Sequence, residues 1–343
     1  MERKKMKKKA FTLVELLVVI AIIAMLLAIL MPALGKVRQM AQRMVCSANL
    51  GGIGKALLAY STDDSYESFP AAGPGGTQWN SIKEALCSWE WNNKAIPGTT
   101  ANPILASPSK STISACLYLL IKYADVSPGQ FICQGGEEKK FDLSVYNATG
   151  TFADVWDFGS CKAGALKDVT EARILTGLSR GHNSYSYHLP FLLATASGTA
   201  TGGTVKPITI TSNPAKAVMA DRNPFWDSTR DTADVAKLYK WLTTSTPEQV
   251  DQDTFQQGNA TAHQKDGQNV LFADGHAKFE KSANCGIEKD NIYTTWGVPT
   301  IDPLTQEDLR QCGGTTKPGP LSSAVVQNWA QNEDDNYLIN DYN

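Results

Sequence analysis

A few histidines and carboxylates are the residues of this sequence whose chemistry could hold a metal ion. Histidine occurs at four positions, 182, 188, 263 and 276. Zinc favours imidazole together with a carboxylate, whereas calcium favours oxygen ligands. The candidate ligand set is therefore Asp221, His263 and Asp274. The alternative is that Asp274 forms a turn and His263 makes hydrogen bonds in a loop. We expect this alternative, and hence no resident metal or other cofactor.

The cysteines offer a second kind of chemistry. They lie at positions 46, 87, 116, 133, 161, 285 and 312, and an oxidising compartment would permit disulfide bonds between some of them. Cys285 and Cys312 form a reasonable pair because they are close in the sequence. Cys46 is the best candidate for an unpaired thiol buried on a helix. The odd total leaves the connectivity open.

The sequence lacks the common enzyme signatures. It contains no phosphate loop, dinucleotide fingerprint, Cys-x-x-Cys pair or His-Glu-x-x-His helix. A catalytic cysteine would need a recognisable histidine and acid around it, and no such context is present. We therefore expect a protein that is not an enzyme.

Asp274 and Gly275 also indicate a turn. Within residues 263–280, strand-like runs flank this pair. Asp-Gly suits the positive φ angles of a two-residue hairpin turn. We therefore predict a β-hairpin with its turn at Asp274 and Gly275.

The N-terminal segment has the clearest pattern. Residues 1–9 hold six basic side chains and one acidic side chain, and an apolar run follows over residues 11–31. As a helix this run would cover about 30 Å, the thickness of the hydrocarbon core of a bilayer. A secretory signal peptide has a shorter apolar core of about 7 to 15 residues. The basic residues predict a cytoplasmic N-terminus, so everything after Pro32 is expected to be extracytoplasmic.

Glu15 interrupts the apolar run. A carboxylate inside a membrane span costs about 2.5 to 3.5 kcal/mol, so it usually has a partner within the membrane. The alternative is a simple signal anchor, in which the carboxylate reaches back to the lipid headgroups. Membrane insertion alone does not distinguish the two.

The segment Lys8-Lys9-Ala10-Phe11-Thr12-Leu13-Val14-Glu15 resembles the signature of type IV prepilins, which pilins and type II secretion pseudopilins share. The resemblance implies that a prepilin peptidase cuts between Ala10 and Phe11 and that the new amine is methylated. Most members have Gly before the cut, whereas this chain has Ala10. The resemblance also implies that Phe11 and Glu15 serve subunit assembly, with the Phe11 ammonium facing Glu15 of a neighbouring subunit. Calcium is the one cofactor it suggests, because secretion pseudopilins often hold calcium near the end of the sheet.

A second resemblance concerns the distal segment. In a large group of pilin-like proteins a histidine precedes Asp-Gly by nine residues. Here ten residues separate His263 from Asp274, so the register differs by one. The short segments around Asn49, Cys133, Tyr185 and Asp221 are similar to that group as well.

The elements that must position these residues follow from periodicity and composition. Residues 1–10 form a leader that is cleaved, 11–31 a transmembrane helix, and 32–62 an amphipathic helix whose apolar side should be covered by a sheet. Residues 63–302 form an extracytoplasmic domain and 303–343 a polar tail that either wraps or ends free. Within the amphipathic helix, Gly51, Gly52 and Gly54 predict a bend or local irregularity.

Inside the extracytoplasmic domain we predict a short helix and several strands. The helix covers residues 115–123, and the strands cover 130–133, 184–189, 205–211 and 217–221. Trp79, Trp89 and Trp91 are expected to pack in the core. The resulting fold class is α+β, a long N-terminal helix packed on a mostly antiparallel sheet, as in pilins.

Charge narrows the possible functions. The net charge is −2 overall, but residues 1–10 hold six of the 32 basic side chains and one of the 34 acidic ones, which leaves 26 basic and 33 acidic, a charge of −7. No basic patch therefore remains outside the leader to bind nucleic acid. We expect a structural subunit of a type II secretion pseudopilus or a type IV pilus-like filament in the inner membrane. Its partners would be related pilin-like subunits, the prepilin peptidase and an inner-membrane assembly platform. The alternative is a binding module, for example for polysaccharide, or a hydrolase that uses the helix as an anchor.

Overall fold

The computed structural model describes residues 13–71, 78–79, 110–111, 113–136, 138–141, 158, 182–188, 190, 207–224, 256, 258–287, 290–293 and 336–339. The chain divides into two compact units, residues 1–42 and 43–343. We describe each unit by itself. The predicted tryptophan positions 89 and 91 lie outside the described residues, and Trp79 is described only as part of a strand.

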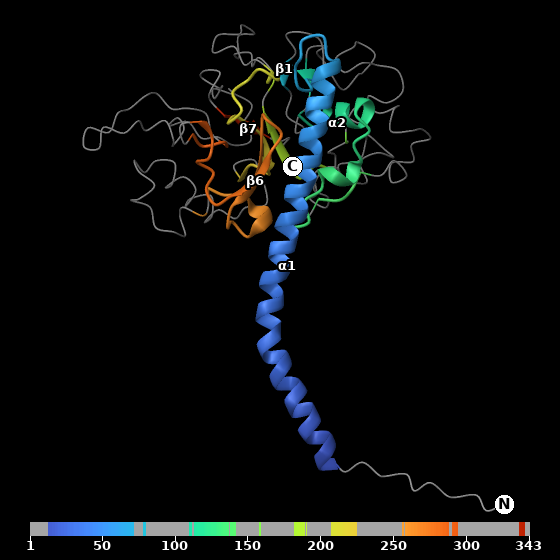
Figure 1. The fold of residues 1–343 in the computed structure, drawn as a ribbon, viewed down its shortest axis with the longest axis vertical. Helices are drawn as coiled ribbons and strands as arrows, with labels where there is room; N and C mark the ends of the chain where they lie inside the picture. Colours follow the sequence, from blue (N-terminus) through green and yellow to red (C-terminus); the bar gives the residue numbers. More distant parts are fainter. Residues whose placement is uncertain are drawn as a thin grey trace, which may run out of the picture. The chain divides into compact units, whose positions relative to one another are not determined.

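Helix α1, Leu13–Asp63, is a single α-helix of 51 residues (Figure 1). Leu, Ile, Ala and Met dominate its first half, and these residues form helices readily. Pro32 lies inside it without ending it. Helical structure also continues through Gly51, Gly52 and Gly54, so these glycines do not interrupt the helix.

The glycines of α1 have a packing role instead. A Cβ on Gly54 would lie 2.6 Å from Leu271 Cδ1 and 3.0 Å from the Gly275 carbonyl oxygen. Only glycine lets the helix come this close to the strands and their turn. The neighbouring turns of the helix bury Cys46, Leu50, Ile53 and Leu57 at spacings of three and four residues. Of the apolar positions predicted to face the sheet, Leu34, Val37 and Met44 are exposed.

Helix α2, Ile113–Tyr123, matches the predicted short helix, and nine of its eleven residues are buried. The predicted strand at residues 130–133 is wrong, because Pro128–Phe131 forms the 3-10 helix η2. Pro128 occupies the start of that turn, and the Ser127 hydroxyl accepts a hydrogen bond from the Gly129 N–H. These two local effects favour a helical turn over an extended strand.

Five strands form one antiparallel sheet, in the order β6-β5-β4-β3-β7. Their bounds are Tyr185–His188 for β3, Ala217–Asp221 for β4, Gln268–Phe272 for β5, Ala277–Glu280 for β6 and Leu338–Ile339 for β7. Two further short strands, β1 (Gln78–Trp79) and β2 (Lys110–Ser111), pair in parallel with each other. The long apolar helix with this open antiparallel sheet confirms the predicted α+β, pilin-like fold class.

The second unit places the Arg43–Asp63 part of α1 between α2 and the sheet (Figure 1). Tyr60 packs against Tyr123 of α2 at 6.4 Å between ring centroids, and Gly54 meets β5 as described above. The residues of β3, β4 and β5 are all buried, whereas β6 at the sheet edge is partly exposed. The interior of this unit therefore lies along β3, β4 and β5.

Two predicted segments turn out differently. Residues 207–211 are not a strand, because Thr209 makes a single bridge to Ser68 and the Thr209 N–H donates to the Ser212 hydroxyl. Such local side-chain bonds compete with strand pairing. Within the predicted polar tail, Leu338 and Ile339 are buried and pair with β3 as β7.

Candidate functional site

Among the predicted processing and assembly residues, Ala10 and Phe11 lie outside the described residues. Glu15 lies in the first turn of α1 and is exposed. A carboxylate at this position interacts favourably with the positive end of the helix dipole.

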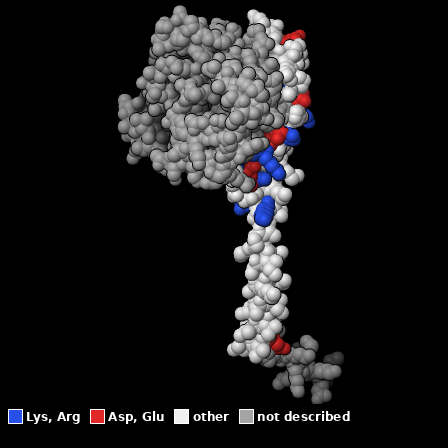
Figure 2. All heavy atoms as spheres, turned by 90° about the vertical axis from the view of Figure 1, so that its left-hand side faces the viewer, with Lys and Arg blue, Asp and Glu red and all other residues white. Residues whose placement is uncertain are grey.

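The stretch of α1 after Glu15 is an exposed apolar surface. From Leu13 to Met31, every large apolar side chain is between 45% and 79% exposed. Figure 2 shows this stretch as a helix surface without Lys, Arg, Asp or Glu, beyond one acidic group near its start. Helix α1 is long and apolar enough to cross a membrane. Soluble proteins rarely leave an apolar surface of this extent in water.

The β5–β6 turn contains Asp274 and Gly275. Hydrogen bonds join the Phe272 N–H to the His276 carbonyl (3.0 Å) and the Gly275 N–H to the Phe272 carbonyl (2.9 Å). The loop therefore has three residues, Ala273 to Gly275, where we predicted two. Positive φ occurs at Gly275 (+87°) but not at Asp274. Asp274 instead accepts hydrogen bonds from the His276 backbone N–H and pairs with the His276 ring.

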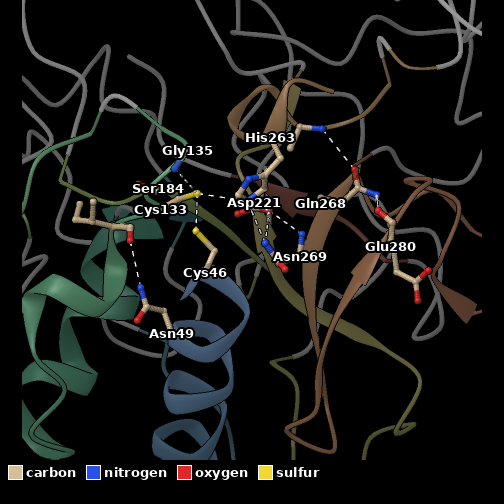
Figure 3. Close-up of polar contacts among 12 residues, drawn as sticks. Cys46, Asn49, Cys133, Gly135, Ser184, Asp221, His263, Gln268, Asn269 and Glu280 are labelled. Atoms are coloured by element: carbon tan, nitrogen blue, oxygen red, sulfur yellow. Dashed lines mark hydrogen bonds and ion pairs between the residues drawn. The ribbon is translucent and has the colours of Figure 1, made fainter. Parts of the chain in front are cut away.

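A second group of side chains comes from four distant segments. Cys46 lies on α1, Cys133 follows η2, Asp221 ends β4, and His263 ends the 3-10 helix η8 (Thr261–His263). Figure 3 shows their side chains pointing toward one another. All four residues are at least 96% buried. We refer to Cys46, Cys133, Asp221 and His263 as the four-residue cluster.

The ligand atoms of the cluster are close together. The two sulfur atoms are 2.8 Å apart. Cys133 Sγ lies 3.5 Å from His263 Nε2, and this nitrogen lies 3.3 Å from Asp221 Oδ2. All four ligand atoms lie within 4.8 Å of one another. Two sulfurs, one nitrogen and one oxygen thus surround a single point.

Two neighbouring residues hold the cluster in place. Asn269 on β5 donates its backbone N–H to Asp221 Oδ2 (2.6 Å), and its Nδ2 lies 3.2 Å from the same oxygen and 3.0 Å from His263 Nε2. The Gly135 N–H donates to Cys133 Sγ (3.3 Å). A Cβ on Gly135 would lie 2.1 Å from the Ala262 carbonyl oxygen. Only glycine therefore permits the close approach of the segments that carry Cys133 and His263.

The electrostatics of the cluster favour a thiolate next to a positive group. The hydrogen bond with Cys133 lowers the pKa of Cys46 to about 5, against the opposing effect of burial. The same hydrogen bond, together with burial, raises the pKa of Cys133. Burial alone would lower the pKa of His263, but hydrogen bonds to Asp221 and Cys46 raise it to about 9.

The structure separates the metal ligands that the sequence indicated. Asp221 and His263 lie together beside Asn269, near the start of β5. Asp274 lies in the turn that follows the end of β5. Cys46 and Cys133 were not predicted to lie with this pair. Cys46 was expected to be a buried thiol without a bonded partner, and its sulfur is buried and not in a disulfide. Cys133 lies in one of the short segments that resemble the group of pilin-like proteins, but this resemblance did not indicate a metal ligand.

The other cysteine expectation concerned Cys285. Cys285 is not in a disulfide and its thiol donates to the Ala283 carbonyl (3.8 Å). Cys312, its predicted partner, lies outside the described residues, so this pairing stays a prediction.

Comparison with known protein families gives a match for the N-terminal region of the chain. Residues 5–31 match the family model described as the prokaryotic N-terminal methylation motif. No curated protein and no solved structure matches the chain. The match covers the leader and the first part of α1, and it means that the chain carries a type IV pilin-like prepilin signature. Proteins with this motif are processed by prepilin peptidases and assemble in the manner of pilins. The apolar helix with this motif fits a single-pass membrane anchor.

Proposed function

We propose that this protein is a structural subunit of a type II secretion pseudopilus or a type IV pilus-like filament. The observation that carries the proposal is the N-terminal methylation motif at residues 5–31 on a helix whose apolar side chains are exposed from Leu13 to Met31. In a monomer within a bilayer, lipid would cover this surface. In a filament outside the bilayer, equivalent helices of other subunits would cover it.

Maturation is the first step of the proposed function. A prepilin peptidase cuts between Ala10 and Phe11 on the cytoplasmic side, and the Phe11 amine is then methylated. Six basic residues before the cut keep the N-terminus cytoplasmic. The domain that follows α1 is then extracytoplasmic, and an inner-membrane assembly platform receives the mature subunit.

Assembly is the second step, and Glu15 is the residue that directs it. After cleavage, the Phe11 ammonium and the Glu15 carboxylate would be only four residues apart in the sequence. Each charge is costly in lipid, but pairing the ammonium of one subunit with Glu15 of the next removes both costs. This pairing also sets the stagger between neighbouring helices.

Intact and N-terminal mass spectrometry of the membrane-extracted protein tests the maturation step. We expect a chain that begins at N-methylated Phe11 in cells that have the peptidase. A chain that keeps Met1 in those cells, or one cleaved near Leu34, would contradict the proposal.

Crosslinking of the full-length protein in membranes tests the assembly step. The variant Glu15→Leu should insert into the membrane at least as well as the wild type, because a costly charge is removed. The yield of its crosslinked oligomers should fall at least about tenfold, which corresponds to a loss of about 1.4 kcal/mol of interaction between subunits. Asp63→Asn is the matched control, because it removes an exposed carboxylate at the other end of α1. Unchanged oligomers in Glu15→Leu would instead favour an anchored binding module or hydrolase.

A further inference from the structure

We propose that Cys46, Cys133, Asp221 and His263 bind a zinc ion inside the extracytoplasmic domain. This inference is independent of the proposed filament function, because it rests on the second compact unit and not on the N-terminal motif. The site has two thiol sulfurs, one imidazole nitrogen and one carboxylate oxygen from four different segments of the chain.

The donor set selects the metal. Structural zinc sites are tetrahedral and are built from cysteine, histidine and, less often, a carboxylate. Calcium and magnesium prefer sites made of oxygen atoms, and sulfur is a poor ligand for both. The cluster therefore does not fit the calcium that the resemblance to secretion pseudopilins suggested. Zinc is the common divalent ion that fits two sulfurs, a nitrogen and an oxygen.

The distances also fit a tetrahedral site. Bonds of about 2.3 Å to sulfur and about 2.0 Å to nitrogen or oxygen require ligand atoms about 3.3 to 3.8 Å apart. The separations of Cys133 Sγ from His263 Nε2 (3.5 Å) and of His263 Nε2 from Asp221 Oδ2 (3.3 Å) lie in this range. The two sulfurs, now 2.8 Å apart, would need to separate by about 1 Å, which a small change of one χ1 angle allows.

Hydrogen bonding by itself leaves this cluster incompletely satisfied. Asp221 is fully buried, yet its Oδ1 has no hydrogen-bond partner among the described residues. A buried, unpaired acceptor typically costs about 1 to 3 kcal/mol. Three polar groups, from Asn269, Asp221 and Cys133, also converge on the single nitrogen His263 Nε2. A divalent cation at their centre would bind the Asp221 carboxylate, the His263 nitrogen and both sulfurs at once.

The surroundings resemble those of a built metal site. The Gly135 N–H donates to Cys133 Sγ, and Asn269 fixes Asp221 through its backbone N–H. Outer contacts of this kind orient the ligands of metal sites. The ring of Phe279 packs edge-on against His263 at 6.0 Å between centroids, and the Arg43 guanidinium lies 4.6 Å from the Phe279 centroid. These groups cover the imidazole and keep water away from it.

A disulfide between Cys46 and Cys133 is the competing use of the two sulfurs. It would need the sulfur atoms to approach to about 2.05 Å. It would leave the side chains of Asp221 and His263 bound, among the described residues, only to each other and to Asn269, with no part in the link between the two cysteines. Zinc accounts for all four residues, and we therefore favour it.

The bound ion would connect α1 to the sheet. Cys46 belongs to the helix, Asp221 to β4, and the other two ligands to segments that flank them. Since four segments far apart in the sequence share one ion, its binding energy would add to the stability of the folded domain. Chelation should therefore lower the melting temperature of the whole extracytoplasmic domain.

Metal analysis of the full-length protein in detergent tests the proposal. We expect one zinc per chain after purification, or uptake of one equivalent by protein stripped with a chelator. Replacement by Co²⁺ should give the sulfur-to-metal charge-transfer band and the intense visible bands of a tetrahedral thiolate site. This spectrum of the wild type does not depend on any variant folding.

The variants Cys133→Ser and His263→Gln each remove a proposed ligand and should lower zinc affinity more than about 100-fold. Asn269→Ala removes a residue that only orients the ligands, so it should lower zinc affinity about 10- to 100-fold. The matched controls are Cys285→Ser, which removes a thiol outside the cluster, and His276→Gln, which removes the histidine that pairs with Asp274. Both controls should keep the metal.

The outcomes separate the possibilities. Wild-type protein that neither contains nor takes up zinc overturns the proposal. Loss of two hydrogens in the intact mass, with a Cys46–Cys133 crosslinked peptide, also overturns it and identifies a disulfide. Equal loss of zinc from Cys285→Ser or His276→Gln would place the metal elsewhere and would overturn the assignment of these four ligands.

Discussion

The two ends of strand β5 carry the same pair of residue types in opposite surroundings. At one end Asn269 binds Asp221, which pairs with His263, and the two side chains are 0% and 2% exposed. After the other end, Asp274 pairs with His276 in the turn, and these side chains are 44% and 51% exposed. An exposed ion pair contributes about 0 to 1 kcal/mol, because water already solvates both groups. A buried pair depends on its partners for nearly all of its solvation.

This difference explains why only one end is a candidate site. The buried pair lies against two sulfurs and excludes solvent, so a cation there would meet four donors with few competing waters. The exposed pair forms part of a turn, where the Asp274 carboxylate accepts a local backbone N–H. The same two residue types thus have a binding role at one end and a turn-forming role at the other.

The largest expected effect is at the buried end. Asp221→Ala should lower the free energy of unfolding by about 3 to 5 kcal/mol, because the Asn269 N–H and His263 both lose their buried partner. Asp274→Ala is the matched control and should cost less than about 1 kcal/mol. Guanidinium unfolding of the full-length protein in detergent with a chelator present measures both without a contribution from metal. Equal losses in the two variants would remove the distinction between the ends.

An intermediate effect is expected at Gly275 in the turn. The variant Gly275→Ala places a Cβ at φ of +87°, 3.0 Å from Leu58 Cδ1, and should cost about 1 to 2 kcal/mol because L-residues disfavour this conformation. Gly129→Ala is the control, since a Cβ there makes only ordinary contacts, 3.7 Å or more from its neighbours. The same unfolding measurement applies. A loss at Gly129 as large as that at Gly275 would argue against backbone strain as the cause.

The smallest effect is expected for Asp274→Asn, and it should depend on pH. Burial raises the pKa of Asp274, but the hydrogen bonds from the His276 backbone and side chain together hold it below its usual value. A lowered pKa stabilises the folded state above the unfolded value of about 3.9, and the contribution disappears as pH falls through the folded value. Wild type and Asp274→Asn should therefore differ slightly near neutral pH and converge in acid. A difference in melting temperature that grows in acid would contradict this assignment.

Sequence reasoning succeeded where the information is local. The α2 helix, strands β3 and β4 and the α+β class follow from periodicity and residue types over a few consecutive positions. It failed at residues 130–133 and 207–211, where Ser127 and Ser212 accept hydrogen bonds from backbone N–H groups two and three residues away, which favours turns over strands. It also made the turn one residue too short, because Ala273 gives no sequence signal for a turn.

What the sequence by itself determined is the N-terminal part of this protein. The basic leader, the apolar run and Glu15 are consecutive, and the methylation motif covers them without reference to any other part of the chain. The four-residue cluster was decided only by the tertiary structure. Cys46, Cys133, Asp221 and His263 are separated by dozens of residues, and each alone is an ordinary buried side chain. They meet because Gly54 lets α1 approach β5 and Gly135 lets its loop approach Ala262, and such close contacts depend on packing that no local pattern encodes.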